Sequence, residues 1–96
     1  MKKYLLIIKF QWNEKIADLI PDHRAYINEL IEQGRLEHYA VSMEQQTLWV
    51  TLNAENKRAA KKLISGSPLY KYWEVEVTEL IVWDGQNYRL PVVQLN

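Results

Sequence analysis

Apolar and polar residues along this chain repeat with two periods. Short alternating segments predict strands at residues 3–10, 35–43, 47–52 and 73–80. Apolar residues three or four positions apart predict helices at residues 13–34 and 53–65. The order strand, helix, strand, strand, helix, strand is the split βαβ, or ferredoxin-like, arrangement. We therefore expect an α+β fold with an antiparallel sheet and both helices on one face.

The first strand is apolar on both sides. Leu5 and Ile7 point one way, and Leu6 and Ile8 point the other, which is typical of a central strand covered on both faces. The sheet face away from the helices should therefore carry large residues: one side of the first strand, together with either Trp49 of the third strand or its opposite-face neighbours. A monomer rarely leaves such a patch to water. We expect a homodimer, or a larger homo-oligomer, in which two sheets meet face to face.

Proline, glycine and asparagine mark the predicted ends of the helices. Pro21 is favourable in a first turn and disruptive inside a helix, so the main first helix is predicted to begin near this residue, after an irregular or short helical piece. Gly34 and Gly66 supply the C-terminal stops. Asn53 is a suitable N-cap for the second helix.

Two strands have less regular patterns. In the second strand, Leu36 and His38 are predicted to share one face. In the fourth strand the alternation breaks near Thr78, which indicates a bulge or burial on both sides. A turn signal at 84–85 is followed by an extra C-terminal tail or short strand, expected at residues 88–95.

Composition narrows the classes of function. The 96 residues are expected to form one domain, residues 1–96. Twelve Lys and Arg balance twelve Asp and Glu, so no overall positive charge favours nucleic acid as a partner. The chain has no cysteine, which removes disulfides and thiolate metal sites. The first apolar run ends at Lys9, too early for a signal peptide or a membrane span. A cytoplasmic protein without a membrane partner is expected.

The segment from Leu63 to Leu80 resembles a known family. It reads Leu63-Ile64-Ser65-Gly66-Ser67-Pro68-Leu69-Tyr70 and then Trp73-Glu74-Val75-Glu76-Val77-Thr78-Glu79-Leu80. This is similar to muconolactone delta-isomerases, in which a helix ends in a Leu-Ser-Gly-Leu-Pro-Leu-Phe type of sequence and leads into an Ile-Glu-Val-Thr-Pro-Leu type of strand. Length and element order agree as well. The resemblance implies a small isomerase that uses no cofactor.

A second, looser similarity is to YCII-related proteins. Asp22-His23-Arg24-Ala25-Tyr26, and the segment from Leu30 to Leu36 with Gly34, resemble their His-bearing first helix and its Gly-Arg-Leu ending. Those proteins place an Asp before the proline as a partner for the helix His, and this chain has Ser67 there. Both families share the dimeric α+β barrel, so the two resemblances imply the same fold.

Two residues are candidate bases for such a reaction. Lactone isomerisation takes a proton from one carbon and returns one to another, so it needs a base and a group that stabilises enolate charge. His23 has an unperturbed pKa of about 6.5, which suits a base; the alternative is a capped or solvated histidine on the inner side of a helix start. Glu76 could have its pKa raised by burial in a cleft; the alternative is an outward-facing carboxylate. Glu74 shares its face, and His38 fits a packed or surface role.

Aromatic residues are numerous for so small a core. Five aromatic residues could line an apolar cleft or could pack the core and the dimer interface: Tyr4, Trp49, Tyr70, Tyr72 and Trp73. Ser67 is a further candidate ligand-binding residue. Two histidines far apart in sequence do not form a metal-binding pattern. Neither a metal nor a cofactor is expected.

Two functions from different classes remain open. The first is a small cofactor-free isomerase that acts on a small apolar lactone or ring compound, with His23 or Glu76 as the proton shuttle. The second is a non-catalytic module for ligand binding or assembly that keeps the barrel without the acid–base pair. Ser67 in the place of Asp favours the second, and Pro68-Leu69-Tyr70 favours the first. Other chemistry of this barrel, such as monooxygenation, is a third alternative.

Overall fold

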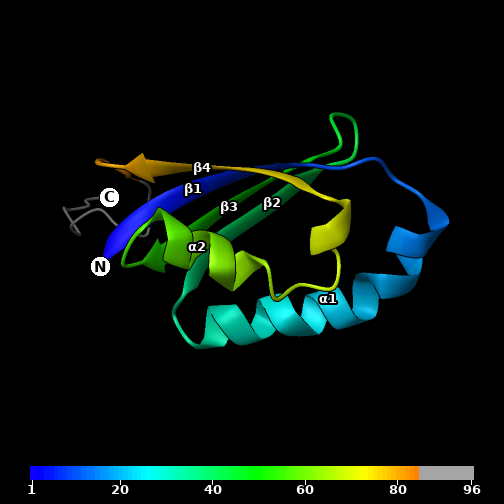
Figure 1. The fold of residues 1–96 in the computed structure, drawn as a ribbon, viewed down its shortest axis with the longest axis horizontal. Helices are drawn as coiled ribbons and strands as arrows, with labels where there is room; N and C mark the ends of the chain where they lie inside the picture. The colour runs from blue at the N-terminus through cyan, green and yellow to red at the C-terminus, as the bar shows by residue number, and fades with distance from the viewer. Residues whose placement is uncertain (85–96) are drawn as a thin grey trace, which may run out of the picture.

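The computed structural model describes residues 1–84, in which a four-stranded sheet carries its helices on one face (Figure 1). The elements in chain order are β1 (Lys2–Lys9), α1 (Glu14–Glu32), β2 (Leu36–Ser42), β3 (Thr47–Ala54), α2 (Lys57–Ile64), the 3₁₀ helix η1 (Tyr70–Tyr72) and β4 (Glu74–Leu80). The strand order is β2-β3-β1-β4, and neighbouring strands are antiparallel. The predicted α+β, ferredoxin-like βαββαβ arrangement is confirmed.

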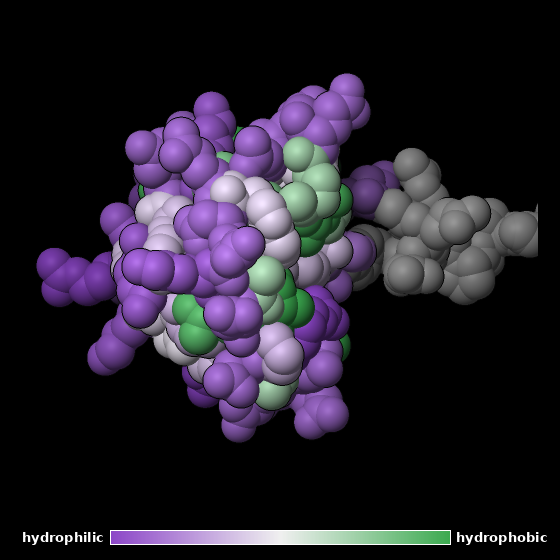
Figure 2. Space-filling model, turned by 90° about the vertical axis from the view of Figure 1, so that its right-hand side faces the viewer, coloured by the Kyte–Doolittle hydropathy of each residue, from purple (hydrophilic) through white to green (hydrophobic). Residues whose placement is uncertain are grey.

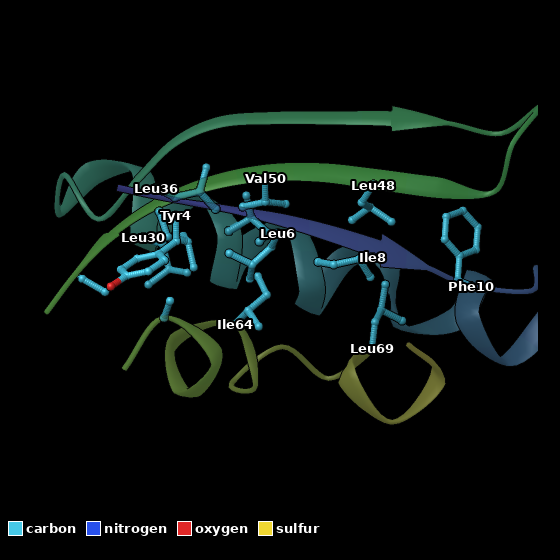
Figure 3. Close-up of a cluster of buried hydrophobic side chains, with 14 of the residues drawn as sticks. Tyr4, Leu6, Ile8, Phe10, Leu30, Leu36, Leu48, Val50, Ile64 and Leu69 are labelled. Carbon is cyan, nitrogen blue, oxygen red and sulfur yellow. The ribbon is translucent and has the colours of Figure 1, made fainter. Parts of the chain in front are cut away.

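The core lies between the helices and one alternating set of residues from each strand. The buried strand residues are Tyr4, Leu6 and Ile8 in β1 and Leu48, Val50 and Leu52 in β3. In Figure 3, Leu30, Ile64 and Leu69 pack against this layer from the helical side. Removal of these side chains from water is the main favourable term in folding.

Helix α1 is continuous, so the prediction that the main helix begins near Pro21 is wrong. Asn13 caps the helix, and its side chain accepts a hydrogen bond from the N–H of Ile16 at 3.0 Å. Pro21 lies inside the helix and is exposed. Ile16 and Ile27, on either side of it, are both part of the buried core. This packing outweighs the cost of an interior proline, about 3 kcal/mol.

Helix α2 begins later than predicted because β3 continues to Ala54. Its N-cap is Asn56, whose side chain accepts a hydrogen bond from the N–H of Ala59 at 2.8 Å. The predicted cap, Asn53, belongs to β3. Its side-chain oxygen instead accepts a hydrogen bond from the Lys3 ammonium at 2.8 Å.

A β-bulge changes which residues of β2 face the helices. Leu36 and His38 occupy successive pairing positions along β3, so Glu37 between them is an extra residue. Leu36 is buried under the helices, whereas His38 is exposed on the opposite face. The prediction that these two residues share a face is therefore wrong. Beyond the bulge, Tyr39 faces the helices.

Strand β4 is regular. It pairs with β1 in unbroken register as far as Leu80, so the pattern break near Thr78 is not a bulge. Ile81 and Val82 follow the strand and are largely exposed. The segment predicted at residues 88–95 lies outside the described residues. Across residues 1–84, no helix has the length and apolar character needed to cross a bilayer.

The sheet face away from the helices, called the open face below, is partly apolar. Leu5 and Ile7 of β1 and Trp49 of β3 are half-buried on it. Ile7 pairs with Trp49 on one side and with Glu76 on the other. The prediction that β1 is apolar on both sides is confirmed. For β3 the sequence left both faces possible, and the structure places Trp49 on the open face and its neighbours Leu48 and Val50 in the core.

Gly66 lies where the chain leaving α2 passes α1. The phenol of Tyr26 in α1 donates a hydrogen bond to the Leu63 carbonyl at 2.5 Å. A Cβ atom on Gly66 would overlap the Tyr26 phenol. Only glycine fits at this crossing, and the crossing brings Ser67 next to α1.

We expect Gly66→Ala to lower the free energy of unfolding by about 1–3 kcal/mol, the usual cost of forcing packed atoms apart. Urea denaturation measures this change. In a Tyr26→Ala background the same substitution should cost much less, because the overlap is with the phenol. Equal costs in the two backgrounds would contradict this contact.

Candidate active site

His23 is a buried imidazole that joins three segments of the chain. The residue is 1% exposed. Its Nδ1 lies 2.7 Å from the Ser67 hydroxyl oxygen, and its Nε2 lies 2.6 Å from the Tyr39 phenol oxygen. The Trp73 ring stands edge-on to the imidazole, with ring centroids 5.5 Å apart. Helix α1, the loop after α2 and strand β2 thus converge on one side chain.

Local structure holds each partner of His23 in place. His23 lies on the buried side of α1, which directs it toward the sheet. The N–H of Ser67 donates to the Ile64 carbonyl at 3.2 Å, and the Ser67 hydroxyl oxygen accepts from the N–H of Leu69 at 3.1 Å. Tyr39 reaches the helical side of the sheet because of the bulge in β2.

Ser67, His23 and Tyr39 form a row of three hydrogen-bonded side chains. The donors and acceptors available to each side chain indicate where its protons lie. If the Ser67 hydroxyl donates to Nδ1, then Nε2–H donates to the Tyr39 oxygen and the phenol proton is available to a ligand. In the reverse arrangement Nδ1–H donates to Ser67 and the phenol donates to Nε2. The Ser67 proton then has no acceptor among the hydrogen bonds of residues 1–84. The first arrangement is favoured, because a buried hydroxyl without an acceptor is costly.

Burial keeps His23 neutral. Desolvation, aided by the positive charge of Arg24, lowers the pKa of His23 from 6.5 to about 4. A neutral imidazole can donate through one nitrogen and accept through the other, as the row requires. A charged imidazolium would have to donate at both nitrogens.

The Tyr39 side chain is a phenol at neutral pH. Burial raises its pKa above the usual 10.0, and the charge of Arg24 opposes that shift. The Arg24 guanidinium carbon lies 5.3 Å from the centroid of the Tyr39 ring. Since the pKa of Tyr39 is raised and that of His23 is lowered, the two shifts oppose proton transfer from the phenol to the imidazole. The pair is uncharged in its resting state.

An apolar cavity of about 100 Å³ opens beside Tyr39. It is lined by Phe10, Trp12, Ile16, Ile20, Tyr39, Val41, Met43, Leu48, Leu69 and Trp73. Trp12 and Met43 are about half exposed, which leaves the cavity open at its rim. Tyr39 is the only lining residue among these with a titratable group. Figure 2, which views the right-hand end of Figure 1, shows separate apolar patches within a hydrophilic surface.

A second hollow, of about 610 Å³, has a different character. It is lined mainly by polar residues, including Lys9, Gln11, Gln46 and Glu74. Lys9 and Glu74 are exposed and pair across β1 and β4. Because this hollow contains no buried titratable group, we place the candidate site at the smaller apolar cavity.

The structure brings together four of the residues predicted from the sequence. His23 and Ser67 are hydrogen-bonded, and Trp73 packs against His23 and lines the cavity. The Tyr70 ring stands edge-on to Trp73, with centroids 6.4 Å apart. The resemblance-based position of Ser67, opposite the helix histidine, therefore corresponds to a real contact.

The other predicted residues lie elsewhere. Glu76 and Trp49 are on the open face, on the far side of the sheet from His23. Tyr4 is 2% exposed within the core. Figure 3 shows it near Leu30 and Leu36, at the opposite end of the core from Phe10, which lines the cavity.

Sequence reasoning missed Tyr39. Its alternation with Val41 and Met43 was visible, and these three residues do line one cavity. However, the face that they occupy depends on the bulge at Glu37, and this appears only when β2 is paired with β3. The His23 contact could not be inferred without that pairing.

Metal ligands do not gather at this site. Among residues 1–84, no group of three or more His, Cys, Asp or Glu side chains is placed to hold a metal ion.

Fold and site together define a small α+β protein in which an apolar cavity adjoins a buried, neutral hydrogen-bonded row. The muconolactone delta-isomerase family model matches residues 9–84, which is most of the chain. The chain therefore belongs to the muconolactone delta-isomerase family, and this supports an isomerase-like function. A comparison with curated proteins finds no significant match. The similarity to YCII-related proteins stays a prediction.

The lowered pKa of His23 predicts a pH-dependent stability. The unfolded chain, with a His pKa near 6.5, takes up the proton before the folded chain, whose His23 pKa is about 4. Stability from neutral His23 is thus complete above pH 6.5 and is lost as pH falls toward 4, by an amount on the order of 2–3 kcal/mol. Urea denaturation from pH 4 to 7 measures it. His23→Gln should remove this part of the slope, and the control His38→Gln should keep it; identical slopes in all three proteins would refute the assignment.

Proposed function

We propose that this protein is a cofactor-free isomerase that moves a double bond in a small apolar lactone or ring compound by proton transfer. One observation carries the proposal: a buried imidazole is hydrogen-bonded to the phenol that lines an apolar cavity, in a member of the muconolactone delta-isomerase family. His23 acts on the substrate through Tyr39, because both of its ring nitrogens are occupied within the row.

The cavity favours a compact ligand. A space of about 100 Å³ with apolar walls suits a single five- or six-membered ring, and Trp73 offers a flat aromatic surface to it. The rim formed by Trp12 and Met43 leaves room for a substituent to reach solvent. The substrate class is therefore a small ring with one polar oxygen placed at Tyr39.

Tyr39 supplies the group that stabilises the enolate. Solvent water at the open rim takes the proton from the ring carbon and returns one to the other end of the shifted double bond. Between these two transfers negative charge lies on the carbonyl oxygen, and the phenol O–H donates a hydrogen bond to it. The hydrogen bond from His23 Nε2–H into the phenol oxygen strengthens this donor. The guanidinium of Arg24, near the Tyr39 ring, adds positive charge close to the developing anion.

A second candidate function has its own support. None of the described residues that line the cavity is a carboxylate or a histidine, so the cavity itself offers no obvious base for the carbon proton. This favours a non-catalytic module that binds the same kind of ring compound and holds its oxygen at Tyr39. The isomerase and the binding module would bind the same ligand, and only the isomerase would convert it.

Tyr39→Phe tests the proposal. With muconolactone and other small unsaturated lactones as probes, we expect the substitution to lower kcat by about 100- to 1000-fold, with a smaller change in KM, because the donor acts mainly on the enolate. Initial rates of double-bond migration measure the effect. Tyr72→Phe is the matched control and should be unchanged, because Tyr72 does not line the cavity. A Tyr39→Phe protein with wild-type rates would refute the role of Tyr39, and a wild type that binds these lactones without converting them would favour the binding module.

We also propose that the protein forms a homodimer through the open face. The half-buried Leu5, Ile7 and Trp49 form an apolar strip across β1 and β3, and charged residues such as Lys9 and Glu76 lie beside it. An apolar strip with a polar rim is typical of a surface that pairs with a second copy. A two-fold axis would set the strip against itself.

Light scattering tests the dimer, with an expected mass of twice the 11.4 kDa of one chain. Ile7→Glu places a charge in the centre of the strip and should shift the protein to monomer. Ile31→Glu is the matched control, because Ile31 is exposed on α1 and lies on the helical side of the sheet. A wild type that runs as a monomer at working concentrations would contradict the proposal.

A further inference from the structure

We propose that an ion pair on the open face, between the buried ammonium of Lys3 and the carboxylate of Glu37, positions Tyr39 for the site on the opposite face by holding the bulge in β2. The inference rests on the proposed function only for its effect on turnover. Its structural content, that Lys3 controls which face Tyr39 occupies, stands separately. Lys3 and Glu37 are thus positioning residues that do not contact the substrate.

The phase of β2 depends on one extra residue. Without a bulge, successive residues after Leu36 would alternate faces, so His38 would turn toward the helices and Tyr39 toward the open face. With Glu37 as the extra residue, His38 pairs with Thr51 on the open face and Tyr39 pairs with Val50 under the helices. The hydrogen bond between Tyr39 and His23 exists only in this second alignment. Bulges near active sites often redirect a side chain in this way.

The side chain of the bulge residue is anchored. Glu37 forms an ion pair with the ammonium of Lys3, a residue that is 3% exposed. The same ammonium donates to the Asn53 side-chain oxygen at 2.8 Å and lies 4.8 Å from the centroid of the Trp83 ring. A buried ammonium must be paired, and Glu37 is the carboxylate that pairs with it among the described residues.

Hydrogen bonds extend this anchor to the start of β2. The Asn53 side-chain amide donates to the Gly34 carbonyl at 3.1 Å, and the Asn53 N–H donates to the Arg35 carbonyl at 2.8 Å. The chain just before the bulge and the bulge residue itself are therefore both tied to β1 and β3. In the regular alignment Glu37 would still face the open side, but it would pair with Thr51, which lies opposite Leu5 and not opposite Lys3. Its carboxylate would then lie farther from the Lys3 ammonium, and the ion pair would be weakened.

Three proteins test the inference: wild type, Lys3→Met, and Lys3→Met with Glu37 deleted. Lys3→Met keeps a long side chain and removes the charge that holds Glu37. We expect β2 to slip and the NMR cross-peaks between the His23 and Tyr39 rings to be lost, with a change in the His23 ring nitrogen shifts. Deleting Glu37 removes the extra residue, so regular alternation itself then places Tyr39 under the helices. We expect the double variant to regain the cross-peaks.

The outcomes are distinct. Wild-type cross-peaks in Lys3→Met would overturn the inference, because the bulge would then not need the ion pair. Loss in Lys3→Met without recovery in the double variant would also overturn it, because the loss would then reflect general damage. These spectra need no substrate, so they decide the inference even if the proposed isomerase activity fails. If the wild type is active, kcat should fall in Lys3→Met and recover in the double variant, with smaller changes in KM.

Discussion

A buried imidazole is stable only if both of its ring nitrogens find hydrogen-bond partners, and in this protein those partners come from segments far apart in the sequence. Ser67 lies after α2 and Tyr39 lies in β2, while His23 itself lies in α1. The two hydrogen bonds fix how the helices sit on the sheet at one end of the core. They also place the Tyr39 phenol at the wall of the apolar cavity. The hydrogen bonds that stabilise His23 in the core therefore also form the candidate site.

Serine at position 67 determines what kind of chemistry this row can support. A carboxylate there would favour a protonated imidazole and would give a charged acid–base pair. The Ser67 hydroxyl carries no charge, and burial and Arg24 keep the pKa of His23 low. The row is therefore neutral, and its most useful group is the Tyr39 phenol. Under the proposed function, the row therefore contributes the Tyr39 phenol as a hydrogen-bond donor to an enolate, and His23 supports that phenol without taking the carbon proton itself.

The sheet separates two environments that depend on each other. Its helical face holds the cavity and the hydrogen-bonded row, and its open face holds the apolar strip and the Lys3–Glu37 ion pair. Because side chains alternate along a strand, a one-residue change of register moves each side chain of that strand to the other face of the sheet. The bulge at Glu37 is the point where this coupling is strongest, since it decides the face of Tyr39.

The sequence by itself determined the element order, the fold class and the apolar character of both sides of β1, because the periods of strands and helices are local properties. It also identified His23, Ser67 and Trp73, the first two through a family resemblance and the third through its aromatic character. It did not determine the continuous α1, because core packing on both sides of Pro21 outweighs a local preference. It misplaced Asn53 as a cap, because strand pairing extends β3. Only the tertiary structure decided the faces of His38, Tyr39 and Glu76 relative to the cavity. A bulge exists only between two paired strands, and a cavity exists only between layers, so neither leaves a pattern that a single stretch of sequence can show.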